Sequence, residues 1–434
     1  MALRGLTFIM FTKREKVQEV QKVVREVVVV VTNPSTYSAI LGKIPSTTSI
    51  MPFFKVFFIL LITVNSLLSS PVAIAGTLPV DSVDILHHRF DGGGMEIDGP
   101  FILVRKSIGT QVSVNGHYYI DSVSAASIDV VANASEYTEE RTEVSAGVDF
   151  LHEKTMISTG YTNSEENDFK ANSVFLSIGQ DFFGDLTKLT MGYARGWDEV
   201  GKIESDFSED VDRQIYKLGM SQVLTKNSLM GLDIETISDE GYLNNPYRSY
   251  RYFDSDNTEF GYSKATEVYP ETRTSTAVAM RGLYYLPYRA SIKGEYRYFS
   301  DSWGIDAHTF EVLYVHPFGR QWTLEAKVRR YSQTSADFYS DIFSHEGAND
   351  FLARDKELST YTGMTYGGGV TYELGQGIIP HVNKLKLTLL VDYLKYEYDN
   401  FRDETAGNGP LDAGKEPFYE FDAWVTRASI TFEY

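Results

Sequence analysis

Residues 424–434 (WVTRASITFEY) end the chain with a regular alternation of side chains. One parity is mainly apolar: Trp424, Thr426, Ala428, Ile430, Phe432 and Tyr434. The other parity is polar: Arg427, Ser429, Thr431 and Glu433. Because successive side chains of a strand point to opposite faces, this stretch predicts a strand with one apolar and one polar face. Soluble sandwiches and membrane barrels both contain such strands, so the rest of the chain has to decide between them.

The same alternation recurs along the chain after residue 76. Clear examples are residues 112–120, 144–150, 290–298, 322–329 and 385–393. In each, apolar or aromatic residues on one parity oppose charged or hydroxyl residues on the other. The chain is therefore predicted to be all-β, with strands whose two faces differ in polarity.

The connections between these segments alternate in length. Short ones fall at 109–110, 152–154, 182–186, 224–227, 286–288 and 317–320, and long ones at 121–140, 163–172, 197–212, 238–273, 333–356 and 399–419. Two depart from their class, since 374–383 is longer and 300–306 shorter than expected. Short turns at one rim and long loops at the other are typical of bacterial outer-membrane barrels. The predicted fold is a transmembrane antiparallel up-and-down β-barrel, with the short turns on the periplasmic side.

About sixteen strands account for the pattern. We predict them at 82–90, 101–108, 111–120, 141–151, 155–162, 173–181, 187–196, 213–223, 228–237, 274–285, 289–299, 307–316, 321–332, 357–373, 384–398 and 420–434. The first hairpin has an unclear register, so fourteen strands also fit. An even number places both ends at the short-turn rim, and closure leaves no unpaired edge in lipid.

Composition agrees with a barrel exported across the inner membrane. Aromatic residues make up 14% of the 434 residues, as expected where rings lie at membrane interfaces. The absence of cysteine excludes disulfides, thiol catalysis and cysteine-ligated metal. Removing the 8 basic and 3 acidic residues of 1–75 leaves 32 basic and 56 acidic residues, a net charge of −24. That acidity argues against nucleic-acid binding.

The first 75 residues are predicted to be absent from the mature protein. Residues 51–75 contain a basic Lys55, a short apolar run at 56–64 and a final Ala-Ile-Ala, which together form a secretory signal peptide cleaved after Ala75. The apolar run is shorter than the roughly 20 residues of a membrane-spanning helix. Residues 1–50 are interpreted as a non-native upstream extension, and residues 76–434 as the barrel.

Several strings resemble one family of predicted outer-membrane barrels. They include DGGGMEIDGP (91–100), YTEERTE (137–143), GYTNSEENDF (160–169), MGYARGWDEVG (191–201), LNNPYRS (243–249), YLPYRASIKGEYRYFSDSWGIDAHTFEV (285–312), ADFYSD (336–341) and FLARDKELSTY (351–361). The chain resembles the domain-of-unknown-function 3570 family over about 78–434. The resemblance implies a barrel in the outer membrane and no particular biochemical activity.

The polar parity supplies candidate pore-lining residues: Arg281, Lys293, Glu295, Arg297, Glu311, Glu325, Lys327, Arg329, Glu143 and Asp149. One hypothesis is that a basic wall faces an acidic wall on the fourth strand and sorts solutes by charge. The alternative is a ladder of salt bridges between neighbouring strands that stiffens the interior. The glycines Gly363, Gly367 and Gly369 either leave room nearby or mark a bend.

Three further patterns have a functional and a structural interpretation. Two acidic clusters contain side chains that suit Ca²⁺: Asp206, Glu209, Asp210 and Asp212, and Asp254, Asp256, Asn257 and Glu259. Both clusters lack the complete calcium-binding loop, which favours the interpretation as solvated loops. The tyrosine- and arginine-rich residues 242–253 suit either sugar binding or a packed loop over the barrel mouth. The eight histidines are scattered and accompany no nucleophile motif, so we expect no enzyme, no bound metal and no cofactor.

The predicted function is a porin-like channel that passes small polar or charged solutes through the outer membrane of a Gram-negative bacterium. The alternatives are a non-conducting barrel with a structural or surface-binding role and, less favoured, an outer-membrane hydrolase. Tyr434, Phe432 and Ile430 form the expected assembly signal, with Tyr434 at the inner interface and Arg427 facing the lumen. The expected partners are outer-membrane lipid and the assembly machinery.

Overall fold

Sixteen antiparallel strands close into a single barrel. The computed structural model describes residues 77–125, 137–203, 205–375, 379–407 and 409–434. The predicted signal peptide and upstream extension, residues 1–75, lie outside this described part. Within it, no helix has the length and the apolar character needed to cross a membrane.

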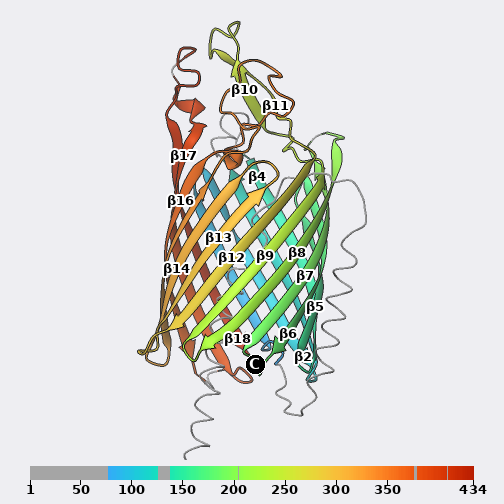
Figure 1. Cartoon of the computed structure of the whole chain (residues 1–434), viewed down its shortest axis with the longest axis vertical. Coiled ribbons are helices and arrows are strands. Elements are labelled where there is room, and N and C mark those ends of the chain that lie inside the picture. The colour runs from blue at the N-terminus through green and yellow to red at the C-terminus, as the bar shows by residue number, and fades with distance from the viewer. Residues whose placement is uncertain (1–76, 126–136, 204, 376–378, 408) are drawn as a thin grey trace, which may run out of the picture.

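The barrel strands are long and run in chain order around the wall (Figure 1). They are β1 (Ser82–Gly92), β2 (Met95–Ile108), β3 (Val112–Ala125), β4 (Tyr137–His152), β5 (Thr155–Glu165), β6 (Phe169–Phe182), β7 (Thr187–Gly201), β8 (Ser208–Thr225), β9 (Ser228–Gly241), β12 (Thr272–Tyr285), β13 (Ser291–Asp301), β14 (Asp306–Phe318), β15 (Trp322–Gln333), β16 (Tyr361–Leu374), β17 (Lys384–Arg402) and β18 (Phe418–Glu433). Each pairs with its neighbours in the chain, and β1 pairs with β18 to close the sheet. The predicted fold and the count of sixteen are confirmed.

Four smaller elements lie in the long connections. The hairpin β10 (Ser249–Phe253) and β11 (Tyr262–Thr266) forms a separate two-stranded sheet between β9 and β12. The 3-10 helices η1 (Lys356–Leu358) and η2 (Glu404–Ala406) precede β16 and follow β17. The predicted fourteenth strand therefore begins too early, because residues 356–358 form η1 and the strand starts at Tyr361.

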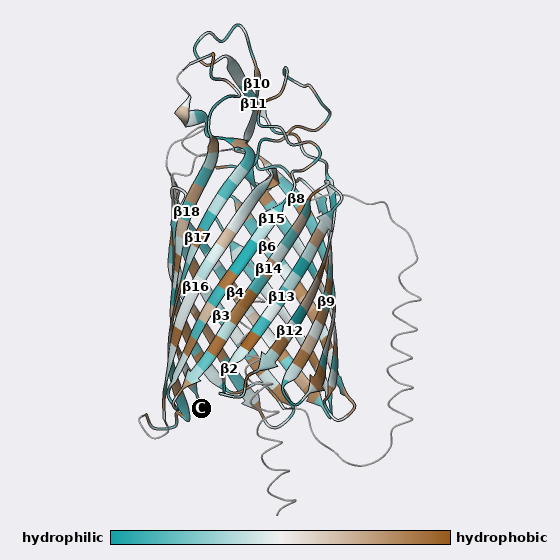
Figure 2. Cartoon of the chain, turned by 60° about the vertical axis from the view of Figure 1, so that its left-hand side comes forward, coloured by the Kyte–Doolittle hydropathy of each residue, from teal (hydrophilic) through white to brown (hydrophobic). Residues whose placement is uncertain are grey.

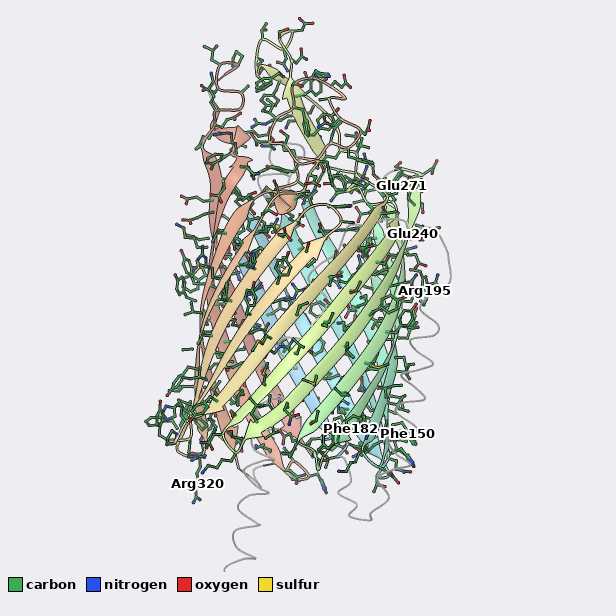
Figure 3. The ribbon with its side chains drawn as sticks, viewed as in Figure 1. Phe150, Phe182, Arg195, Glu240, Glu271 and Arg320 are labelled. Carbon is green, nitrogen blue, oxygen red and sulfur yellow. The ribbon has the colours of Figure 1, made fainter. Side chains whose placement is uncertain are left out.

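Both rims have the predicted character, with one systematic difference. Phe150 and Phe182 lie near the short-turn rim, whereas Glu240 and Glu271 lie at the long-loop rim (Figure 3). Strand pairing continues further toward the long-loop rim than the apolar alternation indicates. The β5–β6 connection, predicted at 163–172, is only residues 166–168, and β1 is joined to β2 by Gly93 and Gly94 alone. The backbone hydrogen bonds of these hairpins continue into polar segments, where apolar residues no longer recur at every second position.

The last strand is anchored at the short-turn rim. Phe432 lies opposite Val83 on β1 and Leu385 on β17. The backbone N–H of Tyr434 donates to the carbonyl of Asp81 (3.1 Å), and its hydroxyl donates to the carbonyl of Arg105 (3.2 Å). The end of the chain is therefore fixed against the first two strands.

Candidate functional site

The two parities of each strand face opposite sides of the barrel wall. Met280, Phe310 and Val312 belong to the apolar parity and are exposed. On the other parity, Val200 and Phe299 pack against a buried cluster built from the long loops above the barrel mouth. Because alternate residues of a closed sheet point in opposite directions, the polar parity faces the interior. We call this inward surface the lumen wall, and teal residues alternate with brown ones along the strands (Figure 2).

All ten candidate pore residues belong to the parity of the lumen wall. On β12, β13 and β14 they contact one another across adjacent strands. The Arg281 guanidinium lies 2.9 Å from Glu295, and the Lys293 ammonium lies 3.3 Å from Glu295 and 3.8 Å from Glu311. Arg297 reaches Glu235 on β9 at 3.7 Å.

A second group of charges spans β15 to β18. The Lys327 ammonium lies 2.9 Å from the Asp392 carboxylate, and the Arg427 guanidinium lies 2.5 Å from the same carboxylate. Lys327 and Asp392 are two strands apart and meet across Gly367 of β16. A Cβ at Gly367 would lie 2.1 Å from Asp392 Oδ1, and one at Gly369 would lie 2.3 Å from Leu390. The glycines therefore leave no open room, because neighbouring side chains occupy it.

The acidic residues of β4 are also paired. Glu143 accepts hydrogen bonds from Arg141 (2.9 Å) and contacts His117 (2.9 Å), while Asp149 contacts Arg105 at 2.5 Å. The charges are thus distributed as pairs within a strand or between strands one or two apart, as in the salt-bridge ladder. The structure does not show a basic wall opposite an unpaired acidic one.

Arg329 and Glu325 differ from the other eight candidates. Within the described part of the chain, neither side chain has an ion pair at 4.0 Å or less. Arg329 lies in register with Glu311 of β14 and Thr365 of β16. Since Glu311 contacts Lys293, the Arg329 guanidinium remains an uncompensated cation on the lumen wall.

Sequence reasoning missed several of the partners: Arg105, Arg141, His117, Lys217, Asp233 and Glu235. Their parity within a strand is visible in the sequence, but pairing requires the register between strands. Lys217, Asp233 and Arg297 keep 51%, 39% and 36% of their side-chain surface exposed. Because they point inward, this exposure indicates solvent-accessible space beside the wall.

The three longest described outer connections, 242–271, 334–360 and 403–417, pack together as a cap. Arg251 of β10 is fully buried and contacts Asp341 (2.6 Å) and Glu416 (2.6 Å), one residue from each of the other two connections. Burial opposes its charge, but the hydrogen bonds and charges of Glu416 and Asp341 outweigh burial and raise the pKa of Arg251. Arg354 further joins the connections through Glu404 at 3.5 Å.

The residues at 242–253 are part of this packing. Tyr250 is buried with Phe343 and Leu352, and Arg248 contacts Asp355. Tyr247 is partly exposed and accepts a hydrogen bond from the backbone of Ile203. The packed-loop interpretation fits this geometry better than sugar binding.

Neither acidic loop cluster forms a metal site in the structure. Among the described residues, no group of three or more His, Asp or Glu side chains is arranged to hold a metal ion. Asp212 instead contacts Arg195 at 2.5 Å, and Asp254 accepts from the Ser263 hydroxyl at 2.6 Å. The Ser263 hydrogen bond lowers the pKa of Asp254. Ion pairing and loop turns account for these carboxylates.

Two histidines lie on the lumen wall beside carboxylates. His88 lies 2.8 Å from Asp121 and 3.3 Å from the hydroxyl of Tyr119, and His117 contacts Glu143. His87, on the opposite face of β1, contacts Asp98 at 3.5 Å. Neither inward histidine contacts a serine or threonine hydroxyl in the described structure, so neither is paired with a nucleophile of the hydrolytic type.

A closed sixteen-stranded barrel with an apolar outer belt and a polar inner wall defines a β-barrel of the outer-membrane type. Residues 197–411 match the model of the family described as "Protein of unknown function (DUF3570)". The family resemblance predicted from the sequence is confirmed. The match is narrower than predicted, since the strings at 91–100, 137–143 and 160–169 lie outside it.

Solved structures with a similar fold share little sequence with this chain. The "Bacterial polysaccharide outer membrane secretin" is 10% identical with a TM-score of 0.45, covering 82% of this chain and 98% of its own. The "CymD monoaromatic hydrocarbon channel" is 8% identical with a TM-score of 0.39 and coverages of 82% and 88%. Outer-membrane expressed OmpT of Vibrio cholerae is 9% identical with a TM-score of 0.38 and coverages of 82% and 100%. No protein of curated function matches the sequence.

Proposed function

We propose that this barrel is a porin-like channel for small polar solutes in the outer membrane of a Gram-negative bacterium. The observation that carries the proposal is the exposure of Lys217, Asp233 and Arg297 on the lumen wall. Charged side chains that pair along the wall, and still keep a third to a half of their surface exposed, leave the centre of the barrel to water. Barrels of sixteen to eighteen strands are wide enough to hold an aqueous channel.

The charge balance of the wall predicts weak ion selectivity. The ladder on β8 to β14 contains four cations and four anions: Lys217, Arg281, Lys293 and Arg297 with Asp233, Glu235, Glu295 and Glu311. These eight charges cancel. On β15 to β18, Lys327, Arg329 and Arg427 stand beside only two carboxylates, Glu325 and Asp392, and the one excess positive charge favours anions locally.

Planar bilayers test this channel. We expect the purified, folded protein to give stable unitary conductance with a small preference for anions. Arg329→Glu should shift the reversal potential toward cation selectivity. Arg330→Glu is the matched control, because Arg330 is the next residue on the same strand and points away from the lumen wall. Equal shifts in both variants would contradict a pore lined by Arg329.

The alternative function is a non-conducting barrel that binds a partner at the cell surface. The observation that favours it is the cap, whose buried Arg251 holds three connections in one arrangement. A heat-modifiable, folded barrel without conductance would support this alternative and reject the channel.

We propose no catalytic activity, and the side chains near the inward histidines support this. His88 and His117 contact Asp121, Tyr119 and Glu143, a set without an aliphatic hydroxyl or thiol nucleophile. We therefore expect that the purified protein has no hydrolytic activity on lipid or peptide that depends on His88 or His117. Measurable hydrolysis that is lost in His88→Ala would contradict this.

The remaining parts of the proposal concern export and partners. We propose that the signal peptide at 51–75 directs secretion and that the assembly machinery folds the chain into outer-membrane lipid. The sequence of 51–75 supports the first part, and the barrel architecture with its closing strand supports the second. The net charge of −19 supports the absence of a nucleic-acid partner. Fractionation of cells that express the full chain, with sequencing of the mature N-terminus, tests location and cleavage together.

A further inference from the structure

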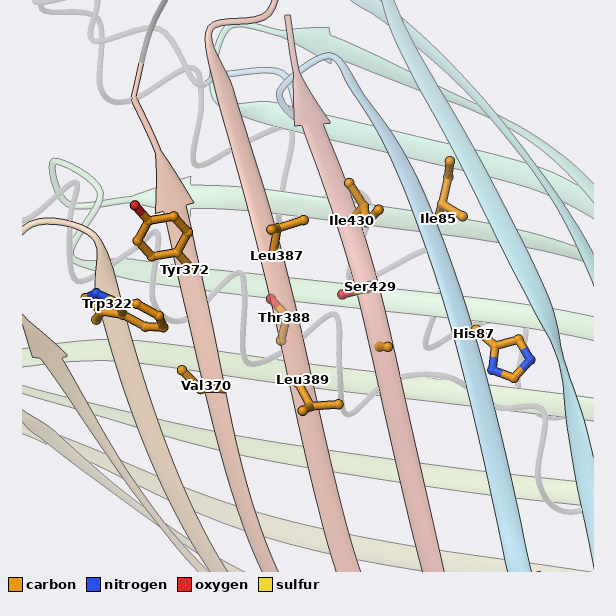
Figure 4. A pocket seen from close by; sticks show the side chains of 11 residues that line it. Ile85, His87, Trp322, Val370, Tyr372, Leu387, Thr388, Leu389, Ser429 and Ile430 are labelled. Carbon is orange, nitrogen blue, oxygen red and sulfur yellow. The ribbon is translucent and has the colours of Figure 1, made fainter. Parts of the chain in front are cut away.

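The outer surface carries an apolar groove over β1 and β15 to β18 (Figure 4). Its volume is about 500 Å³, and its lining includes Ile85, Leu387, Leu389 and Ile430. These side chains are on the parity that faces lipid, so acyl chains satisfy the groove. Contacts that distinguish one polar solute from another therefore belong to the lumen wall.

The charged side chains of the lumen wall differ in their exposure to solvent. Among the described ion pairs away from the two rims, the most exposed members lie on β8, β9 and β13, and we call them the exposed charge group: Lys217, Asp233, Glu235 and Arg297. Each keeps between 30% and 51% of its side-chain surface exposed, whereas Glu143 on β4 keeps 12% and Asp392 on β17 keeps 9%. The solvent-accessible part of the lumen therefore lies beside β8 to β13.

The inward residues of the neighbouring strands β6 and β7 are mostly small. Along 173–179 of β6 and 190–196 of β7 they are Ser173, Phe175, Ser177, Gly179, Thr190, Gly192, Ala194 and Gly196. Gly192 is in register with Lys217, and a Cβ added at Gly192 would lie 3.5 Å from Lys217 Cβ, which is an ordinary contact. Side chains of β6 and β7 therefore leave the exposed charge group open to water, unlike the filled positions around Gly367.

Two alanines of β12 separate the carboxylates of the exposed charge group from its guanidinium. Ala279 is in register with Asp233 of β9 on one side and with Arg297 of β13 on the other. Ala277, the next inward residue of β12, is in register with Glu235. Because an alanine side chain ends at Cβ, β12 places no long side chain between these opposite charges.

The Arg297 guanidinium is held less closely than the other cations beside it. Its ion pair with Glu235 is 3.7 Å long, beyond hydrogen-bonding distance, whereas Lys217 lies 2.8 Å from Glu235 and Arg281 lies 2.9 Å from Asp233. Within the described residues, the Arg297 N–H groups donate no hydrogen bond to the protein. A guanidinium presents its donors in a planar fork that matches a carboxylate, so Arg297 is placed to bind the carboxylate of a solute.

We propose that the exposed charge group selects small zwitterionic solutes, a specificity that rests on the channel function proposed above. The solute carboxylate binds Arg297, and the solute ammonium binds Glu235 or Asp233. Because Arg297 and Glu235 lie 3.7 Å apart, one small molecule reaches both. The group contains two cations and two anions, so a simple anion or cation meets as many repelling charges as attracting ones. A zwitterion satisfies both signs at once, and the surrounding water keeps its binding weak enough for release.

Liposome swelling tests this specificity with two isomers of the same size: glycine, which is a zwitterion, and glycolamide, which is uncharged. After subtraction of the rates in protein-free liposomes, the wild-type protein should admit glycine several-fold faster than glycolamide. Asp233→Asn combined with Arg297→Gln removes one charge of each sign and should bring the two rates together. Lys293→Gln combined with Glu311→Gln is the matched control, because this ion pair of the lumen wall is only 9% and 16% exposed, and it should leave the glycine preference unchanged.

Single cysteines locate the solvent-accessible side of the lumen, because the chain contains none. Ser177 of β6 is in register with Gly192 and faces this side, so a charged thiol reagent should lower the unitary conductance of Ser177→Cys. Ser275→Cys on β12 is the matched control, since Ser275 is an inward serine that is only 6% exposed, and its conductance should not change. An unchanged conductance of Ser177→Cys would place the accessible space elsewhere and reject the proposed contacts.

Three results would overturn zwitterion selection, with heat-modifiable migration establishing that each protein is folded. They are equal admission of both isomers by the wild type, a glycine preference that survives Asp233→Asn with Arg297→Gln, and an equal loss of preference in the control variant. Equal admission of both isomers would leave the channel standing while rejecting its specificity. A folded barrel with no conductance and no swelling in either isomer would reject the channel itself, so the two failures are distinguishable.

Discussion

The contact of Lys327 and Asp392 across Gly367 predicts a strong effect of a single methyl group. In Gly367→Ala, the added Cβ would lie 2.1 Å from Asp392 Oδ1 and 2.9 Å from Lys327 Cε. The Asp392 carboxylate must therefore move away from β16. This displacement weakens its contacts with Lys327 (2.9 Å) and Arg427 (2.5 Å).

The size of the effect follows from these two contacts. A hydrogen bond to a charged group contributes about 1.5–3 kcal/mol, so weakening two of them lowers the free energy of unfolding by about 3 kcal/mol. Gly368→Ala is the control, because it is the same substitution on the next residue, which faces outward. Its nearest atom outside the adjacent residues is the Glu325 carbonyl oxygen at 3.9 Å, and replacing a strand glycine by alanine is neutral or mildly stabilising.

Urea unfolding of both variants in lipid vesicles, followed by tryptophan fluorescence, measures the difference. We expect Gly367→Ala to unfold at lower urea than wild type and Gly368→Ala to unfold at equal or higher urea. If the two variants unfold at the same concentration, Gly367 is not required for the contact between β15 and β17, and the account of the lumen wall at this point is wrong.

Three further predictions concern the cap, the short-turn rim and the closing strand. Arg251→Met leaves the buried carboxylate of Glu416 without its guanidinium partner, which destabilises the cap by about 3–5 kcal/mol. Hydrogen exchange should rise in 334–360 and 403–417 and stay unchanged in the barrel strands. An equal rise in the cap and in the strands would contradict this role of Arg251. The hydrogen bond from Lys106 holds the pKa of Asp81 below its ordinary value of about 3.9. The ionised Asp81 carboxylate stabilises the fold at pH values above its ordinary pKa, and this stabilisation is lost as the pH falls through the lower pKa of the folded state. Asp81→Asn should therefore lower the thermal transition temperature at pH 7 but not at pH 2. Residues added after Tyr434, or Phe432→Asp, should reduce folded barrel in the outer membrane without reducing secretion; normal amounts of folded, extended protein would reject the assembly role.

The sequence contained most of the architecture because the outer face of the wall is simple. Lipid requires the same kind of residue at every second position, so alternation, together with the connection lengths, indicated about sixteen strands. The first outer connection was harder to predict, because the charged residues Arg89, Asp91, Glu96 and Asp98 interrupt the apolar period near Gly93 and Gly94.

The inner wall and the cap depend on contacts that periodicity does not encode. The inward parity of Lys327 is visible in the sequence, but its partner Asp392 lies 65 residues further on and two strands away. Arg251 and Glu416 are separated by 165 residues and meet only because the loops fold over the mouth. A sequence pattern indicates which side of a strand a charge occupies, and the register decides which charge it meets.

The pairing of β1 with β18 also sets the order in which the barrel is completed. Ser82 lies opposite Glu433, so this seam joins residues about 350 positions apart, whereas every other adjacent pair of barrel strands is joined by a hairpin connection. Contacts of such long sequence separation form slowly, because chain entropy opposes bringing the ends together. We expect the β1–β18 seam to form last, after the hairpin pairs have formed. The folding intermediate before that step is an open sheet with two unpaired edges. The hydrogen bond from the Tyr434 N–H to the Asp81 carbonyl closes the seam at the short-turn rim, so the lifetime of the open sheet is expected to depend on these two residues.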